Sequence, residues 1–315
     1  MDVEIITYAN NTDVAMLRNL VKTLTKNKYR YTILGVGEKW EGFMTKIKAS
    51  LSHVQSLPPK NIVAFIDGYD VFAAGPADEL MAKYRSYGYP LVVGAETYCG
   101  ANCTPLTEWW KLHKDNGNGI RYCNSGFYIG EAGSVAKALQ YMLDLGISDD
   151  QVAFCEYINK HPADVMLDTE AKLVGNVTPF DFKDIYLKDG VFTMKRTGSQ
   201  PSFIHVPGRS GDLMIRANYI GKSLLGKDYE PTTVREVWNE WSGKVSTFFE
   251  RNLLVLIMSI AALWVIIIAV IIFIPTMVLP FIGLLVVIFA AFAMWYSKFF
   301  SPIGIYGGGC GCRDK

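Results

Sequence analysis

The fold of this chain is decided by one short stretch, Ile62-Val63-Ala64-Phe65-Ile66-Asp67-Gly68-Tyr69-Asp70. Its apolar part is rich in β-branched residues, which is typical of a strand buried on both faces of a parallel sheet. Ligands of open α/β sheets bind beyond the carboxyl ends of the strands, where Asp67 and Asp70 stand. We expect Gly68 to let the chain turn at once, so that both carboxylates reach one side and form a site for Mg²⁺ or Mn²⁺. An ordinary polar turn that begins with a capping Asp67 is the alternative.

The sequence around this stretch alternates between strand and helix patterns. Strands are predicted over Val3–Tyr8, Tyr31–Val36, Ile62–Asp67 and Leu91–Ala95, and helices over Asp13–Lys26, Phe43–His53 and Pro76–Tyr84. Such alternation implies right-handed crossovers and a mostly parallel sheet. The predicted fold class of the globular part is therefore α/β.

Length, charge and cysteine content limit the function classes. With 315 residues and a formal net charge of +1, the chain has room for one large domain and an appendage, and it lacks a basic field for nucleic acid. The N-terminus lacks the basic and apolar regions of a signal peptide, so we expect the globular part to stay where it is made. Six scattered cysteines do not make a disulfide framework and are interpreted as reduced thiols. Cys99 and Cys103 have the spacing of half a zinc site, but no second pair follows, so thiols are favoured.

The composition changes sharply near residue 251. The run from Leu253 to Ile274 has no charged residue, and at ~1.5 Å per residue it is long enough for a ~30 Å hydrocarbon core. A second such run, Met277 to Tyr296, follows almost at once, which predicts a hairpin of two transmembrane helices. Before it, Pro231–Arg251 is predicted to be an amphipathic helix that either lies in the membrane interface or packs on the globular domain.

Four parts are therefore expected along the chain: a globular domain at 1–222, a linker with the amphipathic helix at 223–250, the two spans at 251–297 and a Gly/Cys tail at 298–315. The loop between the spans has no Lys or Arg, whereas basic residues flank the hairpin on both sides. By the positive-inside rule, both termini and the globular domain are expected on the cytoplasmic side. Cys310 and Cys312 would then be open to acylation, with plain thiols as the simpler interpretation.

Loops with small residues follow or precede several strands. Gly35-Val36-Gly37-Glu38-Lys39-Trp40 is a weak dinucleotide motif because the third glycine and the downstream acid are out of register. We interpret it as a loop that makes room for a ligand and offers Trp40 for stacking, the alternative being a tryptophan packed beneath its own loop. Cys123-Asn124-Ser125-Gly126 is placed before a predicted strand, as expected where the backbone passes close to a ligand.

Two further sites carry polar residues whose role stays open. Asp149-Asp150-Gln151 begins a predicted helix, and residue type alone favours capping over binding of sugar hydroxyls. His205 ends a short apolar strand and would complete a borderline site for Mn²⁺ with the two aspartates, although a lone histidine is more often structural. Gly208 and Arg209 follow in a loop suited to contacting a diphosphate.

Taken in order, these motifs resemble those of the N-terminal glycosyltransferase domain of the procollagen lysyl hydroxylases, a GT-A-like domain that uses UDP-sugars. The matching series spans the soluble part of the chain and none of the membrane part. It consists of Ile6-Thr7, GVGEKWEG at 35–42, FIDGYDVFAAGPADEL at 65–80, GAETYC at 94–99, CNSGFYIG at 123–130, DDQ at 149–151, HVPG at 205–208 and Asn218-Tyr219-Ile220-Gly221. The resemblance implies a GT-A, Rossmann-like domain, here as a stand-alone copy with a C-terminal membrane hairpin.

The resemblance also implies roles for individual residues. The family's metal ligands, and with them Mn²⁺ as cofactor, are matched by Asp67, Asp70 and His205. Contacts to the nucleotide of the UDP-sugar are matched by Thr7, Trp40 and Tyr69, the two aromatic residues flanking the uracil. The acidic pair that faces the donor sugar and the acceptor is matched by Asp149 and Asp150, so the resemblance favours catalysis over capping there.

The chain departs from the family at Gly100, where the family has Trp, and at Pro207, where it has Asn. Both positions line the acceptor side, so donor and metal binding are expected and the acceptor stays open. The implied function is transfer of a hexose from UDP-glucose, or next UDP-galactose, to a hydroxyl on a glycan or protein. The alternative is a catalytically degenerate, membrane-anchored structural protein, for example a virion component, because such stand-alone domains resemble ones carried by large viruses. Lysine hydroxylation is not expected, because the sequence shows no hydroxylase domain.

Overall fold

The computed structural model describes residues 3–99, 104–178, 182–207, 211–231 and 285–292. The chain separates into two compact units, Met1–Thr232 and Thr233–Lys315. In the second unit, residues 285–292 form a helix whose apolar side chains are exposed from residue 286 onward. Within the described ranges, no helix combines the length and the apolar character that a membrane span requires. Apart from these residues, the predicted hairpin at 251–297 lies outside the described part, as do the tail and the amphipathic helix beyond Pro231.

The first unit is built on a six-stranded sheet. Its strands are β1 (Glu4–Tyr8), β2 (Arg30–Leu34), β3 (Ile62–Asp67), β5 (Leu91–Glu96), β6 (Tyr122–Glu131) and β7 (Val165–Leu167). They lie in the order β2-β1-β3-β6-β5-β7, and every pair is parallel except the two that β6 makes with β3 and β5. The predicted α/β class and the mostly parallel sheet are confirmed.

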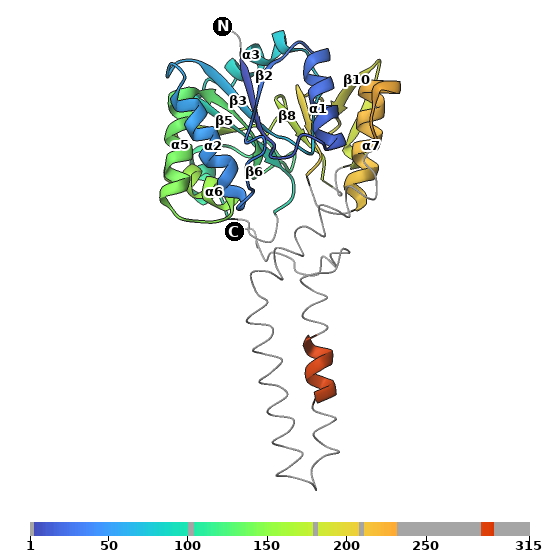
Figure 1. The fold of residues 1–315 in the computed structure, drawn as a ribbon. Helices are drawn as coiled ribbons and strands as arrows, with labels where there is room; N and C mark the ends of the chain where they lie inside the picture. Colours follow the sequence, from blue (N-terminus) through green and yellow to red (C-terminus); the bar gives the residue numbers. More distant parts are fainter. Residues whose placement is uncertain (1–2, 100–103, 179–181, 208–210, 232–284, 293–315) are drawn as a thin grey trace, which may run out of the picture. The chain divides into compact units, whose positions relative to one another are not determined.

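Alternating side chains of the central strands enter two separate cores. Phe65 of β3 and Tyr128 of β6 pack on one face, and Ala64 and Ile66 of β3 pack on the other. The first face is covered by α2 (Phe43–Gln55), α5 (Ala132–Asp144) and α6 (Asp150–Lys160), which Figure 1 shows grouped on one side of the sheet. The second face is covered by α1 (Ala15–Lys26) and α3 (Ala77–Arg85). A strand buried on both faces accounts for the continuous apolar run of β3.

A second, three-stranded sheet joins distant parts of the sequence. Its order is β4-β11-β8, where β4 is Val71–Ala73, β11 is Phe203–His205 and β8 is Val174–Asn176. The central strand β11 is antiparallel to β4 and parallel to β8. The sequence did not predict β4, which begins directly after Asp70. The remaining elements are α4 (Thr107–Leu112), the hairpin of β9 (Ile185–Lys188) and β10 (Val191–Met194), α7 (Gly211–Leu225), and short 3-10 turns at Phe182–Asp184 and Gly226–Asp228.

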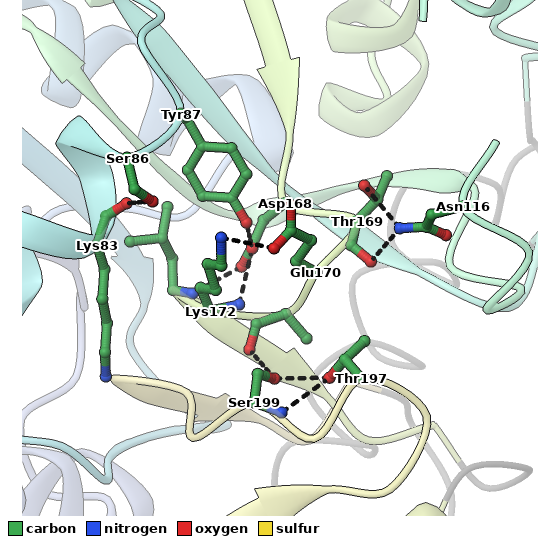
Figure 2. A network of polar contacts seen from close by, with 12 residues as sticks. Lys83, Ser86, Tyr87, Asn116, Asp168, Thr169, Glu170, Lys172, Thr197 and Ser199 are labelled. Atoms are coloured by element: carbon green, nitrogen blue, oxygen red, sulfur yellow. Dashed lines mark hydrogen bonds and ion pairs between the residues drawn. The ribbon is translucent and has the colours of Figure 1, made fainter. Parts of the chain in front are cut away.

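A buried carboxylate fixes the entry to β8. Asp168 follows β7 directly and accepts hydrogen bonds from the backbone N–H groups of Lys172, Leu173 and Val174 at 2.8–2.9 Å. The hydroxyl of Tyr87 also donates to Asp168, and Figure 2 shows the ring pointing at this carboxylate. Burial raises the pKa of Asp168 to about 6, although the bonds from Tyr87 and the backbone act in the opposite direction. Asp168 therefore anchors the segment that leads into β8.

Candidate active site

The ends of β3 and β11 bring together the three predicted metal ligands. One ligand atom each from Asp67, Asp70 and His205 lies within 4.8 Å of the others. The backbone explains the meeting, because β4 starts directly after Asp70 and pairs Val71 with His205. The N–H of Val206 also donates to the carbonyl of Asp70 at 2.8 Å. Strand pairing thus delivers a histidine from a distant part of the chain to the two carboxylates.

Two buried atoms of this cluster make no hydrogen bond within the described part of the chain, Asp70 Oδ1 and His205 Nε2. His205 Nε2 lies 3.3 Å from Asp70 Oδ2, which is an ion-pair distance without hydrogen-bond geometry. Burial lowers the pKa of His205, but the Asp70 carboxylate raises it more, so the net shift is upward. Buried polar atoms are normally satisfied, and two carboxylates with one imidazole are a donor set that fits a divalent cation.

The backbone of Gly126 leaves no room between these ligands and β6. A Cβ atom at this position would lie 2.4 Å from His205 Cε1 and 2.9 Å from Asp67 Oδ2. The backbone at Gly126 therefore does make the close approach expected from the sequence, but it approaches the predicted metal-binding side chains of His205 and Asp67. The segment Asn124–Gly126 lies within β6 rather than before it. The register between β5 and β6 shifts at Gly94, so this part of β6 forms a bulge.

Gly68 serves the site for a reason other than the one expected from the sequence. Its φ is not in the left-handed region that favours glycine, so the turn itself does not require it. A Cβ atom there would instead lie 2.7 Å from the carbonyl oxygen of Tyr8 and 3.1 Å from Thr7 Oγ1. The absence of a side chain lets the turn after β3 pack against the end of β1. Thr7 Oγ1 is buried and has no hydrogen-bond partner within the described ranges.

A buried lysine links the predicted metal ligands to the predicted acidic pair. Lys46 Nζ lies 2.8 Å from Asp67 Oδ1 and 2.9 Å from Asp150 Oδ2, and its side chain is only 8% exposed. Ser125 Oγ donates to the same Asp150 oxygen at 2.8 Å. Burial lowers the pKa of Lys46, but the two carboxylates raise it more, so the lysine stays charged. Sequence reasoning missed Lys46, although it lies on the buried face of α2 with Ile47.

The two residues of the acidic pair have different surroundings. Asp149 is the N-cap of α6 and accepts from the N–H groups of Gln151 and Val152 at 3.0 and 3.1 Å. Asp150 is buried and points to Lys46 and Ser125. Asp149 thus forms the helix cap that residue type favoured. The Asp150 carboxylate is connected to that of Asp67 through Lys46, which contacts both.

Another acid, Glu96, lies at the end of β5 beside Asn124 and Gln151. Its carboxylate accepts from Asn124 Nδ2 at 3.1 Å and from Gln151 Nε2 at 3.3 Å. Glu96 is buried and raises the pKa of His205 electrostatically, as Asp67 does. The sequence offered one signal for it, a carboxylate directly after a buried strand.

The predicted nucleotide contacts surround the end of β1. Trp40 is 40% exposed, and its ring centroid lies 5.6 Å from that of Tyr8 at an interplanar angle of 49°. Asn10 connects Tyr69 to the loop that precedes Trp40, because its carbonyl accepts from Gly37 N at 3.0 Å and its Oδ1 accepts from Tyr69 Oη at 3.2 Å. The exposed Trp40 is not packed beneath its own loop. The predicted diphosphate contacts Gly208 and Arg209 lie outside the described residues.

The interpretation of all cysteines as reduced thiols is wrong at one position. Cys99 is disulfide-bonded, whereas Cys123 and Cys155 are free and buried. A low cysteine count argues against a framework of several disulfides, but it does not exclude a single bridge.

Comparisons with known proteins agree with the resemblance found in the sequence. The family model described as the PLOD GT domain matches residues 1–229. Procollagen-lysine,2-oxoglutarate 5-dioxygenase of Drosophila melanogaster is 29% identical over 62% of this chain and 29% of its own length. The human multifunctional procollagen lysine hydroxylase and glycosyltransferase LH3 is 24% identical over 61% of this chain and 28% of its own. This chain therefore spans less than a third of the length of either hydroxylase.

A mimivirus protein and a solved glycosyltransferase also align with this chain. The uncharacterized protein R699 of Acanthamoeba polyphaga mimivirus is 24% identical over 59% of this chain and 41% of its own length. A solved glycosyltransferase involved in the glycosylation of the major capsid of PBCV-1 aligns with a TM-score of 0.44 and 11% identity, over 70% of this chain and 98% of its own. The match to the family model covers most of the sequence and the whole site described above, so this chain is a glycosyltransferase-type protein that belongs to the PLOD GT domain family.

Proposed function

We propose that this protein transfers a hexose, glucose before galactose, from a UDP-sugar to a hydroxyl on a glycan or protein acceptor. The observation that carries the proposal is the cluster of Asp67, Asp70 and His205, with two buried ligand atoms that make no hydrogen bond within the described part of the chain. Carboxylates suit Mg²⁺ and Mn²⁺, and the imidazole nitrogen favours Mn²⁺ of the two.

The charge balance of the site supports binding of a cation. Four carboxylates, those of Asp67, Asp70, Glu96 and Asp150, are grouped around His205 and Lys46. Lys46 balances only part of this negative charge. A diphosphate would be repelled by such a group unless a divalent cation joined the two.

Each group of residues has a role in the proposed reaction. A bound Mn²⁺ would supply charge neutralisation for the diphosphate as the glycosidic bond breaks. Trp40, with Tyr69 and Thr7 nearby, would hold the uridine at the end of β1. Asp150, fixed by Lys46 and Ser125, would face the donor sugar and stabilise positive charge on it or orient the acceptor hydroxyl.

The test uses the full chain in detergent with a panel of UDP-sugars and MnCl₂, and it measures release of UDP. UDP-glucose should give the fastest release, and Asp70→Ala and His205→Ala should each abolish it while leaving the circular dichroism spectrum unchanged. Asp164→Ala is the matched control, because this exposed acid pairs with the surface groups Lys137 and His161 and not with the predicted metal ligands. Near-native turnover in both site variants would contradict the metal assignment. Metal binding without turnover of any donor would favour the structural alternative.

We also propose that the chain is anchored in a membrane, of a host or a virus, with its glycosyltransferase domain and both termini on the cytoplasmic side. Two apolar runs at 251–297 and the flanking basic residues Lys244, Arg251 and Lys298 support this orientation. The exposed apolar helix at 285–292 agrees with a lipid-facing segment. In sealed microsomes, added protease should digest the domain without detergent. Protection until detergent is added would refute the orientation.

A further inference from the structure

Asn176, which the proposed function does not use, lies directly against the imidazole of His205. The parallel pairing of β8 with β11 aligns these two residues, and Asn176 Oδ1 lies 2.7 Å from His205 Nδ1. Both side chains are buried. This contact lies on the side of the ring opposite to Asp70, which faces Nε2.

A second hydrogen bond fixes which way the side-chain amide of Asn176 faces. Asn176 Nδ2 donates to the carbonyl oxygen of Ala95 at 2.8 Å, at the end of β5. A backbone carbonyl can only accept, so the amide nitrogen must face Ala95 and the amide oxygen must face His205. The amide oxygen also only accepts, and at 2.7 Å from Nδ1 it has the hydrogen-bond geometry that the Asp70 carboxylate, 3.3 Å from Nε2, lacks, so this contact favours the neutral tautomer with its hydrogen on Nδ1. The lone pair of Nε2 is then free on the side of Asp67 and Asp70.

The ring has little freedom to escape this arrangement. The backbone of Gly126 lies against Cε1, the carbon between the two nitrogens, so closely that a Cβ atom would be 2.4 Å away. Both ends of the amide's contact are themselves hydrogen-bonded, because Asp168 accepts from Val174 at the start of β8 and Ala95 belongs to the large sheet. Asn176 therefore joins the two sheets at the position that decides which nitrogen of His205 faces the ligand cluster.

We propose that Asn176 is a positioning residue that holds the hydrogen of His205 on Nδ1 and so presents Nε2 as a ligand for a divalent cation. The proposal rests on the proposed function for the identity of that ligand site. A second residue that fixes the tautomer and orientation of a metal-binding histidine typically changes metal affinity by about 10–100-fold when it is removed. A purely structural tie between β8 and β5 would alter stability without changing the tautomer.

The first measurement is the tautomer itself, from long-range ¹H–¹⁵N spectra of the full chain labelled at its histidines, at a pH where the ring is neutral. The chain has only four histidines, and His205→Gln identifies the signal of interest. The native protein should show the Nδ1–H form. Asn176→Leu should give a mixture or the Nε2–H form, and Asn176→Asp, which keeps an acceptor at this place, should retain Nδ1–H.

The second measurement is Mn²⁺ affinity, followed by the free Mn²⁺ signal in electron paramagnetic resonance. Asn176→Leu should weaken binding by about 10–100-fold, and Asn176→Asp should recover most of it. Gln151→Leu is the matched control for loss of a site amide, because Gln151 contacts Glu96 and Ser125 but not His205. Gln151→Glu controls for the charge that Asn176→Asp adds.

The outcomes separate this proposal from the proposed function. Native Mn²⁺ binding together with an unchanged tautomer and unchanged affinity in Asn176→Leu would overturn the role of Asn176 and leave the metal site standing. A native chain that binds no Mn²⁺ would overturn the metal-dependent function, whatever tautomer is found. If Asn176→Leu does not fold, the same two measurements on Asn176→Asp and the Gln151 variants decide the matter: loss of the Nδ1–H form in Asn176→Asp would refute the proposal.

Discussion

Replacing Lys46 with methionine tests whether one buried cation holds the carboxylates of the site together. Methionine keeps the length and the apolar stem, so the variant removes mainly the charge. Asp150 would keep the hydrogen bond from Ser125 but lose its cation, and Asp67 would lose its 2.8 Å partner. Removing one partner of a buried ion pair costs about 3–5 kcal/mol. Asp67 is 26% exposed, which places the expected loss at the lower end, near ~3 kcal/mol.

The assay is thermal unfolding of the full chain with and without MnCl₂. For a domain of this size 1 kcal/mol corresponds to about 2–4 °C, so Lys46→Met should lower Tm by roughly 6–12 °C without metal. Lys60→Met is the control, because Lys60 has the same 2.8 Å distance to Glu131 but is 79% exposed and should cost less than about 1 kcal/mol. Added Mn²⁺ should raise the Tm of Lys46→Met more than that of the native chain, because a competing cation beside Asp67 has gone. A Tm within experimental error of the native value, or a larger Mn²⁺ effect on the native chain, would refute this reasoning.

Three further outcomes are expected. Gly126→Ala should fold but lose Mn²⁺ binding in isothermal titration, because its Cβ would collide with His205; native-like affinity would show that the ring can move aside. Trp40→Ala should weaken UDP binding in the same instrument by the ~1–3 kcal/mol that stacking of one base contributes, and an unchanged affinity would remove Trp40 from the donor site. As the pH rises from about 4 to about 6, the contribution of Asp168 to stability should fall by about 3 kcal/mol, because the raised pKa lets folded Asp168 keep a proton that the unfolded chain releases. Urea unfolding of Asp168→Asn should lack this slope, and an identical pH profile would contradict the assignment.

The sequence was sufficient where a pattern is long or repeated. The buried run of β3 and the polar residues at its end predicted both the sheet and the place of Asp67 and Asp70, since burial on two faces leaves a continuous apolar run. The helix α1 was recognised through the apolar residues that recur on one of its faces. Residue type and the strand end raised His205 as a possible partner of the aspartates, and the family resemblance, not the spacing, favoured that assignment over a structural histidine.

Other features had no pattern strong enough to be read. The strand β4 has three residues, too few for a periodic signal, yet its pairing with β11 places His205 beside Asp70. A lysine at position 46 of an amphipathic helix is normally solvated, and its burial depends on carboxylates from β3 and α6. Asn176 ends another three-residue strand and acquires its role only through pairing with β11. The reason for Gly68, contact with β1, is likewise a tertiary one.

The three-stranded sheet also determines when the site can exist during synthesis. Asp67 and Asp70 leave the ribosome early, whereas β8 and β11 are made near the end of the domain. Because β11 pairs with both β4 and β8, His205 can reach the aspartates only after loop closure across most of the domain. Contacts so distant in sequence form slowly. A nascent chain would thus offer two carboxylates without their imidazole, and the complete metal site would be among the last features of the domain to form.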